Sequence, residues 1–290
     1  MINRFGLALL APLVSLATPA AAEVRLIPKG APPADAAPPE PTYADTADLA
    51  DSARFVLRAQ VRKVLPVQPE RAPGVRAGWG RFYIEARTRA LVSGPGVVGE
   101  ILRYLADMPL DLRGRPPGMA KREVLLFARS ATPSAKGKGT DLALVAPDAQ
   151  MIWSEPREAL ARRVISDLQQ DDAPAGVRGL REAIHVPGTL AGEGETQLFL
   201  AMADDSAASI SVVHRPGAPV AWGVSFSEVV AGATGAPPRE TLAWYRLACF
   251  LPAELPRQAN LSATPADAAQ AVADYRLVRR ELGECPRTRR

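Results

Sequence analysis

The sequence is poor in the residue types that carry most catalytic and metal chemistry. Its 290 residues include only two histidines, His185 and His214, and only two cysteines, Cys249 and Cys285. There is no CxxC pair for thiol–disulfide exchange, no HExxH helix for zinc and no GxxxxGK loop for phosphates. We identify no dinucleotide-binding fingerprint either. The sequence therefore predicts neither a cofactor nor a metal.

Lysine and aromatic residues are also scarce. Only five of the 35 basic residues are lysines, aromatic residues make up 6% of the chain, and the formal net charge is +4. The arginines alternate with acids over most of the length, and few aromatics are present to stack on bases, so nucleic-acid binding is not expected. Only the tail is locally basic, at Arg279–Arg280 and then Arg287, Arg289 and Arg290. The tail would suit an anionic envelope surface, but a solvated terminus is the favoured interpretation.

The first 22 residues have the three parts of a secretory signal. Arg4 supplies a positive charge, residues 5–17 form a mostly apolar run, and Ala20-Ala21-Ala22 supplies small residues for cleavage. The apolar run has 13 residues, too few for a membrane span, which needs about 20. We therefore expect cleavage after Ala22, a periplasmic or secreted location, and no transmembrane segment in the mature chain.

The two cysteines are expected to form a disulfide. They lie 36 positions apart with no other cysteine in the chain. In an oxidising compartment an isolated pair is most simply a disulfide bond.

Five segments of alternating polarity predict a small β-barrel over residues 43–153. A proline-rich linker, residues 23–42, precedes them, and Asp45, Asp48 and Asp51 mark a short helix at their start. Turn-forming residues separate the five segments, as in a small closed or nearly closed barrel. The expected strands cover residues 55–64, 79–92, 97–105, 123–129 and 141–145.

The order of these segments resembles a known family. A short helix leads into the strand at residues 55–64, a long strand ends at Leu91-Val92-Ser93-Gly94, and Val124-Leu125-Leu126-Phe127 forms a later strand. This arrangement resembles the OB-fold barrel of the netrin and metalloproteinase-inhibitor kind. The N-terminal cysteines that carry inhibition in the metalloproteinase inhibitors are absent here, so the resemblance implies the barrel and not the inhibitory mechanism.

The rest of the chain predicts a helix and connector, residues 154–187, and an α+β module, residues 188–290. Ser154 and Pro156 introduce the helix, as N-cap and first-turn residues. The module is expected to contain strands at 196–202, 208–215 and 220–226, a helix at 241–250, and a final helix that starts at Thr264 and stops at Gly283. The fold class is thus mostly β with α+β.

Two constellations in the α+β module are candidates for function. His214, Ser225 and Asp204 contain the residue types of a hydrolase triad, although the GxSxG elbow is missing. A hydrogen-bonded surface histidine is the favoured interpretation of His214. Four aromatic residues could instead line a groove, but a buried core is favoured for them; they are Trp222, Trp244, Tyr245 and Phe250.

These observations favour an exported protein that binds or scaffolds in the cell envelope without catalysis, its partner being an envelope protein or an anionic envelope surface. Two alternatives stay open at this level. One is a periplasmic hydrolase that uses His214 and Ser225, and the other is an inhibitor of an envelope protease.

Overall fold

The computed structural model describes residues 40–133, 139–227 and 235–289. The expected signal segment and nearly all of the proline-rich linker lie outside these residues. The elements run in the order α1 (Tyr43–Ser52), β1 (Phe55–Pro66), η1 (Pro69–Arg71), β2 (Trp79–Ser93), β3 (Ile101–Pro109), β4 (Glu123–Pro133), β5 (Thr140–Leu144), β6 (Gln150–Ile152), α2 (Glu155–Leu168), β7 (Val177–Pro187), β8 (Gly194–Met202), β9 (Ser209–His214), β10 (Ala221–Ser225), α3 (Leu242–Ala248), η2 (Arg257–Ala259) and α4 (Pro265–Leu282).

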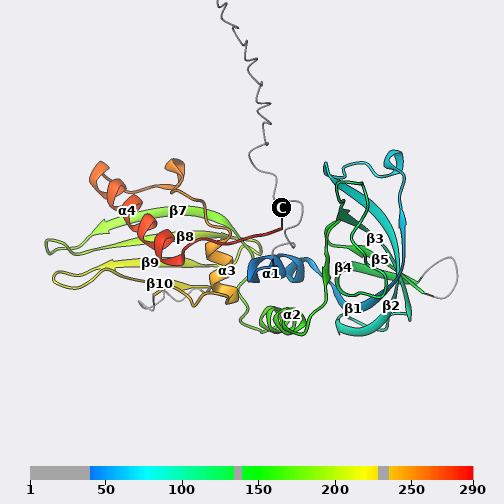
Figure 1. Cartoon of the computed structure of the whole chain (residues 1–290). Coiled ribbons are helices and arrows are strands. Elements are labelled where there is room, and N and C mark those ends of the chain that lie inside the picture. The colour runs from blue at the N-terminus through cyan, green and yellow to red at the C-terminus, as the bar shows by residue number, and fades with distance from the viewer. Residues whose placement is uncertain (1–39, 134–138, 228–234, 290) are drawn as a thin grey trace, which may run out of the picture. The chain divides into compact units, whose positions relative to one another are not determined.

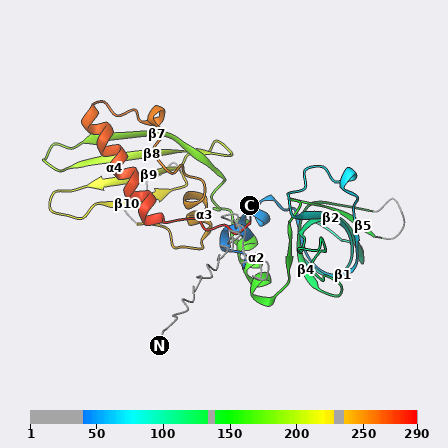
Figure 2. The same ribbon diagram turned by 45° about the horizontal axis from the view of Figure 1, so that its top comes forward.

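Strands β1 to β5 form a closed barrel of mixed strand direction, consistent with the OB-like barrel that the sequence predicted. The strand order is β1-β2-β3-β5-β4, and pairing of β1 with β4 closes the ring. All pairs are antiparallel except β3 with β5. Figure 2 shows these strands curving round a common axis. Short β6 adds to β4 outside the ring.

The barrel encloses an apolar core that follows from strand alternation. Over residues 57–61 of β1 every second residue points inward, and Leu57, Ala59 and Val61 are fully buried. On β2 the same alternation buries Phe82 and Ile84. The alternation predicted from the sequence therefore identifies the inner face of both strands.

The second sheet is antiparallel, in the order β10-β9-β8-β7. Helix α4 lies across one face of it, in red in Figure 1. Thr264 caps α4 by accepting from the Asp267 backbone N–H, and Gly283 ends it with φ of 71°. Glycine adopts this left-handed conformation without the steric penalty that other residues have, so the predicted stop is confirmed.

The disulfide between Cys249 and Cys285 is present, as the sequence predicted. It joins the residue after α3 to the segment just beyond α4. The residues that follow Cys285 are therefore anchored close to α3.

Strands β6 and β7 were not expected from the sequence. Strand β7 lies in the segment predicted as a connector, so the second sheet begins at Val177 rather than near residue 188. Charged residues interrupt its alternation, and its pairing with β8 contains two register shifts. An edge strand of this kind gives a weak periodic signal. The third barrel strand also begins later than expected, at Ile101, and Val97 is fully exposed.

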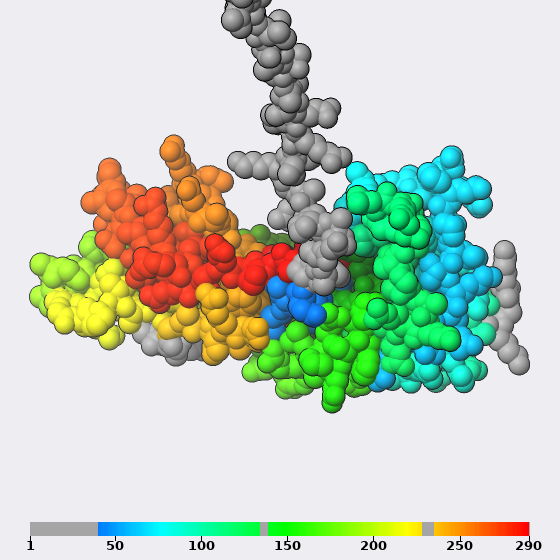
Figure 3. All heavy atoms as spheres, in the orientation of Figure 1, coloured from blue at the N-terminus to red at the C-terminus, as the bar shows by residue number. Residues whose placement is uncertain are grey.

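The three aspartates of α1 bind groups from the C-terminal third of the chain. Asp51 pairs with Arg246 of α3 at 2.6 Å, and Asp48 accepts from the Tyr245 hydroxyl at 2.6 Å and from Arg287. Asp45 accepts from three donors of the terminal segment, which lies beside α1 in Figure 3. The three-residue spacing of these aspartates, which predicted the helix start, thus also places each carboxylate beside a different partner.

Asp45 makes the fold sensitive to acid. Burial opposes ionisation, but hydrogen bonds from Thr288, Thr42 and Arg289 outweigh it and hold the pKa of Asp45 below its ordinary value of 3.8. A carboxyl whose pKa is lowered by folding stabilises the protein above the ordinary value, and this stabilisation is lost as the pH falls through the lowered pKa. We expect the free energy of unfolding, measured with urea, to fall below about pH 4 and to fall less steeply in Asp45→Asn. If the free energy of unfolding falls equally steeply with pH in both proteins, Asp45 is not the cause. Asp172→Asn, at an exposed site, is the control.

Among the described residues, no helix combines the length and the apolar character needed to cross a bilayer.

Candidate functional site

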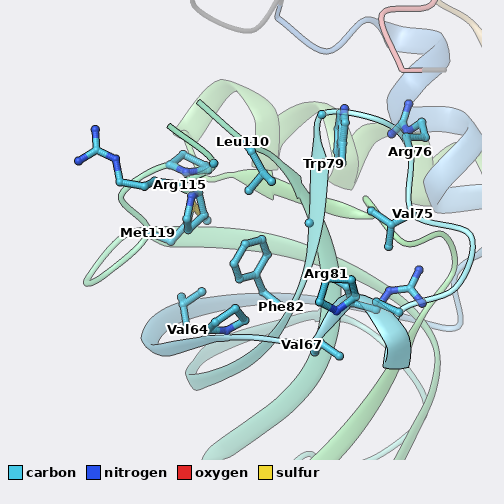
Figure 4. A pocket seen from close by; sticks show the side chains of 18 of the residues that line it. Val64, Val67, Val75, Arg76, Trp79, Arg81, Phe82, Leu110, Arg115 and Met119 are labelled. Carbon is cyan, nitrogen blue, oxygen red and sulfur yellow. The ribbon is translucent and has the colours of Figure 1, made fainter. Parts of the chain in front are cut away.

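A groove of about 940 Å³ opens at one end of the barrel. Two connections form most of its wall: residues 67–78, which join β1 to β2, and residues 110–122, which join β3 to β4. The adjoining ends of β1 and β2 complete it. Figure 4 shows Phe82 and Leu110 pointing into its middle.

The lining of the groove is mainly apolar. Phe82 and Met119 form a buried floor, and Leu110, Val75 and Trp79 are partly exposed. Their side chains offer an apolar surface already open to a ligand, which is the usual character of small-molecule sites.

Gly80 helps to make room for this floor. A Cβ at this position would lie 3.1 Å from the Phe82 ring and 3.3 Å from the Leu110 side chain. These distances are shorter than ordinary van der Waals contact, so a larger residue would displace one of the two side chains. Gly74 and Gly78, both with φ of 77°, provide the turns of the first connection.

Every charged residue among the described residues that line the groove is an arginine. Arg81 is bound to Asp107 by two hydrogen bonds, of 2.7 and 2.9 Å. Arg76 stacks over the Trp79 ring at 4.0 Å and bonds to Asp148 at 3.3 Å.

The third arginine, Arg115, is the most exposed of the three. Its side chain is 64% exposed and pairs with Asp111 at 3.0 Å, four residues earlier in the same connection. Such surface pairs contribute little to stability, so this guanidinium is available to a ligand at small cost.

A second polar cluster lies between the second sheet and α4. Both histidines of the chain converge on Asp274, which is 3% exposed. His214 Nε2 lies 2.8 Å from one carboxylate oxygen, and Gln270 donates to the same oxygen at 2.9 Å. The Thr196 hydroxyl donates to the other oxygen and lies 2.9 Å from His185 Nδ1. The cluster satisfies its buried polar atoms internally, as stable cores require.

The remaining contacts of His185 fit a structural role. Its ring packs against Gly194, where a Cβ would lie 2.8 Å from the ring, and its backbone N–H donates to Ser262. The side chain is only 8% exposed. His214 is more accessible, at 18%.

The structure does not bring His214, Ser225 and Asp204 together. The register pairs Gly194 with His214 at one end of β9 and Ser225 with Ser209 at the other, so His214 and Ser225 are separated by about 17 Å along the strands. Asp204 lies in the turn after β8 and binds Ser206. The carboxylate that His214 contacts is Asp274, 60 residues away, which sequence proximity could not identify.

The aromatic residues of the second module form core rather than a groove. Trp222, Trp244 and Tyr245 are 2%, 3% and 1% exposed. Phe250 packs edge-on against Tyr245, with ring centroids 5.2 Å apart. The favoured interpretation of these residues is confirmed for the three buried ones.

Sequence reasoning missed the groove because its lining comes from connections rather than from periodic segments. It also passed over a GxGxxG string at residues 94–99, which lies between β2 and β3. No helix follows this string, so it lacks the helix N-terminus that binds a pyrophosphate. Among the described residues, no group of three or more His, Cys, Asp or Glu side chains is arranged to hold a metal ion.

Comparison of the chain with known protein families and with curated protein sequences found no match.

Proposed function

We propose that this protein is an exported, non-enzymatic binding protein of the cell envelope and that its ligand lies in the groove at the end of the barrel. The observation that carries this proposal is the groove itself. It offers about 940 Å³ of space with a buried apolar floor at Phe82 and Met119. Apolar clefts of roughly 300 to 1,000 Å³ are typical of ligand sites.

Export is supported by the disulfide and by the N-terminal sequence. A bond between Cys249 and Cys285 is compatible with a location outside the reducing cytoplasm. The charged, apolar and small-residue parts of residues 1–22 fit a cleaved signal. Mass spectrometry of the protein recovered from the envelope tests this: the mature form should begin at Glu23, and an intact Met1 would contradict it.

The groove is tested with an uncharged solvatochromic dye such as Nile red. We expect the emission of the dye to shift to the blue when it binds the wild type. Binding should also change the fluorescence intensity of Trp79, which lines the groove. Leu110→Glu places a charge in the apolar lining and should weaken dye binding by about tenfold or more, since burying an unpaired carboxylate is costly.

Leu112→Glu is the matched control. This residue lies in the same connection but is 92% exposed and does not line the groove. Its affinity for the dye should stay within about twofold of the wild type. Equal affinities in all three proteins, with unchanged thermal unfolding, would contradict the groove as the binding site.

A second candidate function rests on the contact between His214 and Asp274. A histidine oriented by a buried carboxylate is one part of a hydrolase site, and this pair is present at 2.8 Å. No hydrogen bond joins His214 to a serine within the described residues. If the protein is a hydrolase, His214→Ala should abolish turnover of ester substrates while the protein stays folded. The binding proposal expects no effect of this change on dye affinity.

The protease-inhibitor alternative differs in stoichiometry. An inhibitor would block an envelope protease at one molecule per enzyme, whereas a groove that binds a small molecule would leave protease activity unchanged.

A further inference from the structure

We propose that the ligand of the groove is a single-chain anionic amphiphile, a long-chain fatty acid, with its alkyl chain on the apolar floor and its carboxylate at the arginines of the rim. This inference rests on the proposed function, because it names the ligand class of the same groove. Three features of the described residues support it: the charge of the connections, the placement of the arginines and the shortage of backbone donors.

The two connections that form the groove concentrate positive charge. Residues 67–78 and 110–122 together contain six basic and two acidic residues. Their excess of four positive charges equals the formal net charge of the whole chain, +4. Adding Arg81 with its partner Asp107, and Asp148 as the partner of Arg76, still leaves seven basic and four acidic residues, so the local field favours an anion at this end of the barrel.

The arginines border the apolar lining and do not form its floor. Arg76 and Arg115 lie at opposite ends of the rim in Figure 4, with Phe82 and Leu110 between them. The acids that pair with the three lining arginines, Asp107, Asp111 and Asp148, do not themselves line the groove. A ligand that enters the groove therefore meets apolar side chains in the middle and only guanidinium charges at the edge.

Arg115 is best placed to bind the carboxylate. It is 64% exposed, and its ionic partner Asp111 is itself 44% exposed. A guanidinium presents two parallel N–H donors that match the two oxygens of a carboxylate. Exchange of the Asp111 carboxylate for that of the ligand conserves the number of charge-assisted hydrogen bonds.

The backbone around the groove is poorly suited to an extended peptide. Beyond Gln60, β1 no longer pairs with β4, and the strand edge that this leaves carries Pro66. Pro69, Pro116 and Pro117 also line the groove and have no N–H to donate. The nearby N–H groups of Val67 and Leu110 already donate to Arg81 and Gly78.

The backbone N–H and C=O groups of an extended peptide need hydrogen-bond partners along its length. The prolines and the N–H groups already in use leave gaps in the row of backbone partners along the groove. An alkyl chain needs no hydrogen bonds along its length. The lining therefore favours the alkyl chain over a peptide.

The test measures displacement of the uncharged dye by three twelve-carbon ligands that differ in the head group: dodecanoate, dodecanol and dodecyltrimethylammonium, each below its micellar concentration. We expect dodecanoate to bind about tenfold more tightly than dodecanol, and the cation to bind weakest. In Arg115→Gln, the ratio of dodecanoate affinity to dodecanol affinity should fall to about threefold or less.

Arg181→Gln is the control, since Arg181 is 62% exposed and lies in β7 of the second sheet. It should retain the full preference for dodecanoate. High salt should reduce the preference in the wild type, because exposed charges are screened.

Each contrary outcome overturns a different statement. Equal affinity for dodecanoate and dodecanol overturns the anionic head group but leaves the groove as a binding site. Displacement by neither ligand, while dye binding still depends on Leu110, overturns the alkyl chain. Sedimentation with vesicles of anionic phospholipid without dye displacement would assign the arginines to a membrane surface and overturn the proposal. Dye binding that is insensitive to Leu110→Glu contradicts the proposed function itself.

Discussion

Replacing Asp274 with alanine is expected to lower the free energy of unfolding by about 3 to 5 kcal/mol. The carboxylate is 3% exposed and accepts hydrogen bonds from Thr196, Gln270 and His214. Its removal leaves the hydroxyl of Thr196, which is fully buried, without the carboxylate that it donates to, and removes the negative charge beside two histidine rings that lie 6.2 Å apart. A buried polar group that loses its partner costs far more than the net value of the bond itself. Urea-induced unfolding followed by circular dichroism measures the change.

Two further variants separate the cluster from general effects of losing an aspartate. Asp274→Asn keeps the size of the side chain and one acceptor oxygen, so its loss should be smaller than that of Asp274→Ala. Asp172→Ala, at an exposed site, should stay within about 0.5 kcal/mol of the wild type. A loss below about 1 kcal/mol in Asp274→Ala would show that solvent satisfies these groups and that the cluster is not structural.

Removal of the disulfide is expected to cost about 3 to 4 kcal/mol in the chain-entropy description, since the bond closes a loop of 36 residues. The variant Cys249→Ala/Cys285→Ala should unfold at a lower urea concentration than the oxidised wild type. It should also lose protection from hydrogen exchange at Thr288 and Arg289, whose backbone N–H groups donate to Asp45. The reason is that the bond anchors the segment that carries both residues.

A reductant provides the control for this experiment. Dithiothreitol should destabilise the wild type to the level of the double variant and should leave the double variant unchanged. A wild type that is equally stable with and without reductant would mean that the fold holds the terminal segment without the covalent bond.

The sequence was most informative where one physical signal dominates. Alternation of apolar and polar residues along β1 and β2 identified the inner face of the barrel, because strand side chains point to opposite sides in turn. Thr264 and Gly283 marked both ends of α4, since an N-cap acceptor and a left-handed glycine act locally. The cysteine pair was predictable because only one pairing exists.

The signals failed where tertiary contacts decide the structure. Ser154 precedes α2 as expected, yet its side chain makes no capping hydrogen bond. Strand β7 has interrupted alternation because it lies at a sheet edge with two register shifts, so only its pairing with β8 defines it. The partner of His214 was sought among neighbours in sequence, whereas the fold brings Asp274 from α4.

Five barrel strands, the final helix and the disulfide could be predicted from the residues alone, because each depends on local periodicity, a local cap or an unambiguous pairing. The place where a ligand could bind follows from tertiary contacts. The groove lies between the connections of residues 67–78 and 110–122. Neither connection has a periodic pattern, and they come together because β1 to β3 curve round the barrel. Likewise, the partners of the α1 aspartates lie about 195 to 244 positions away in the sequence. Contacts over such separations form only when the chain is folded.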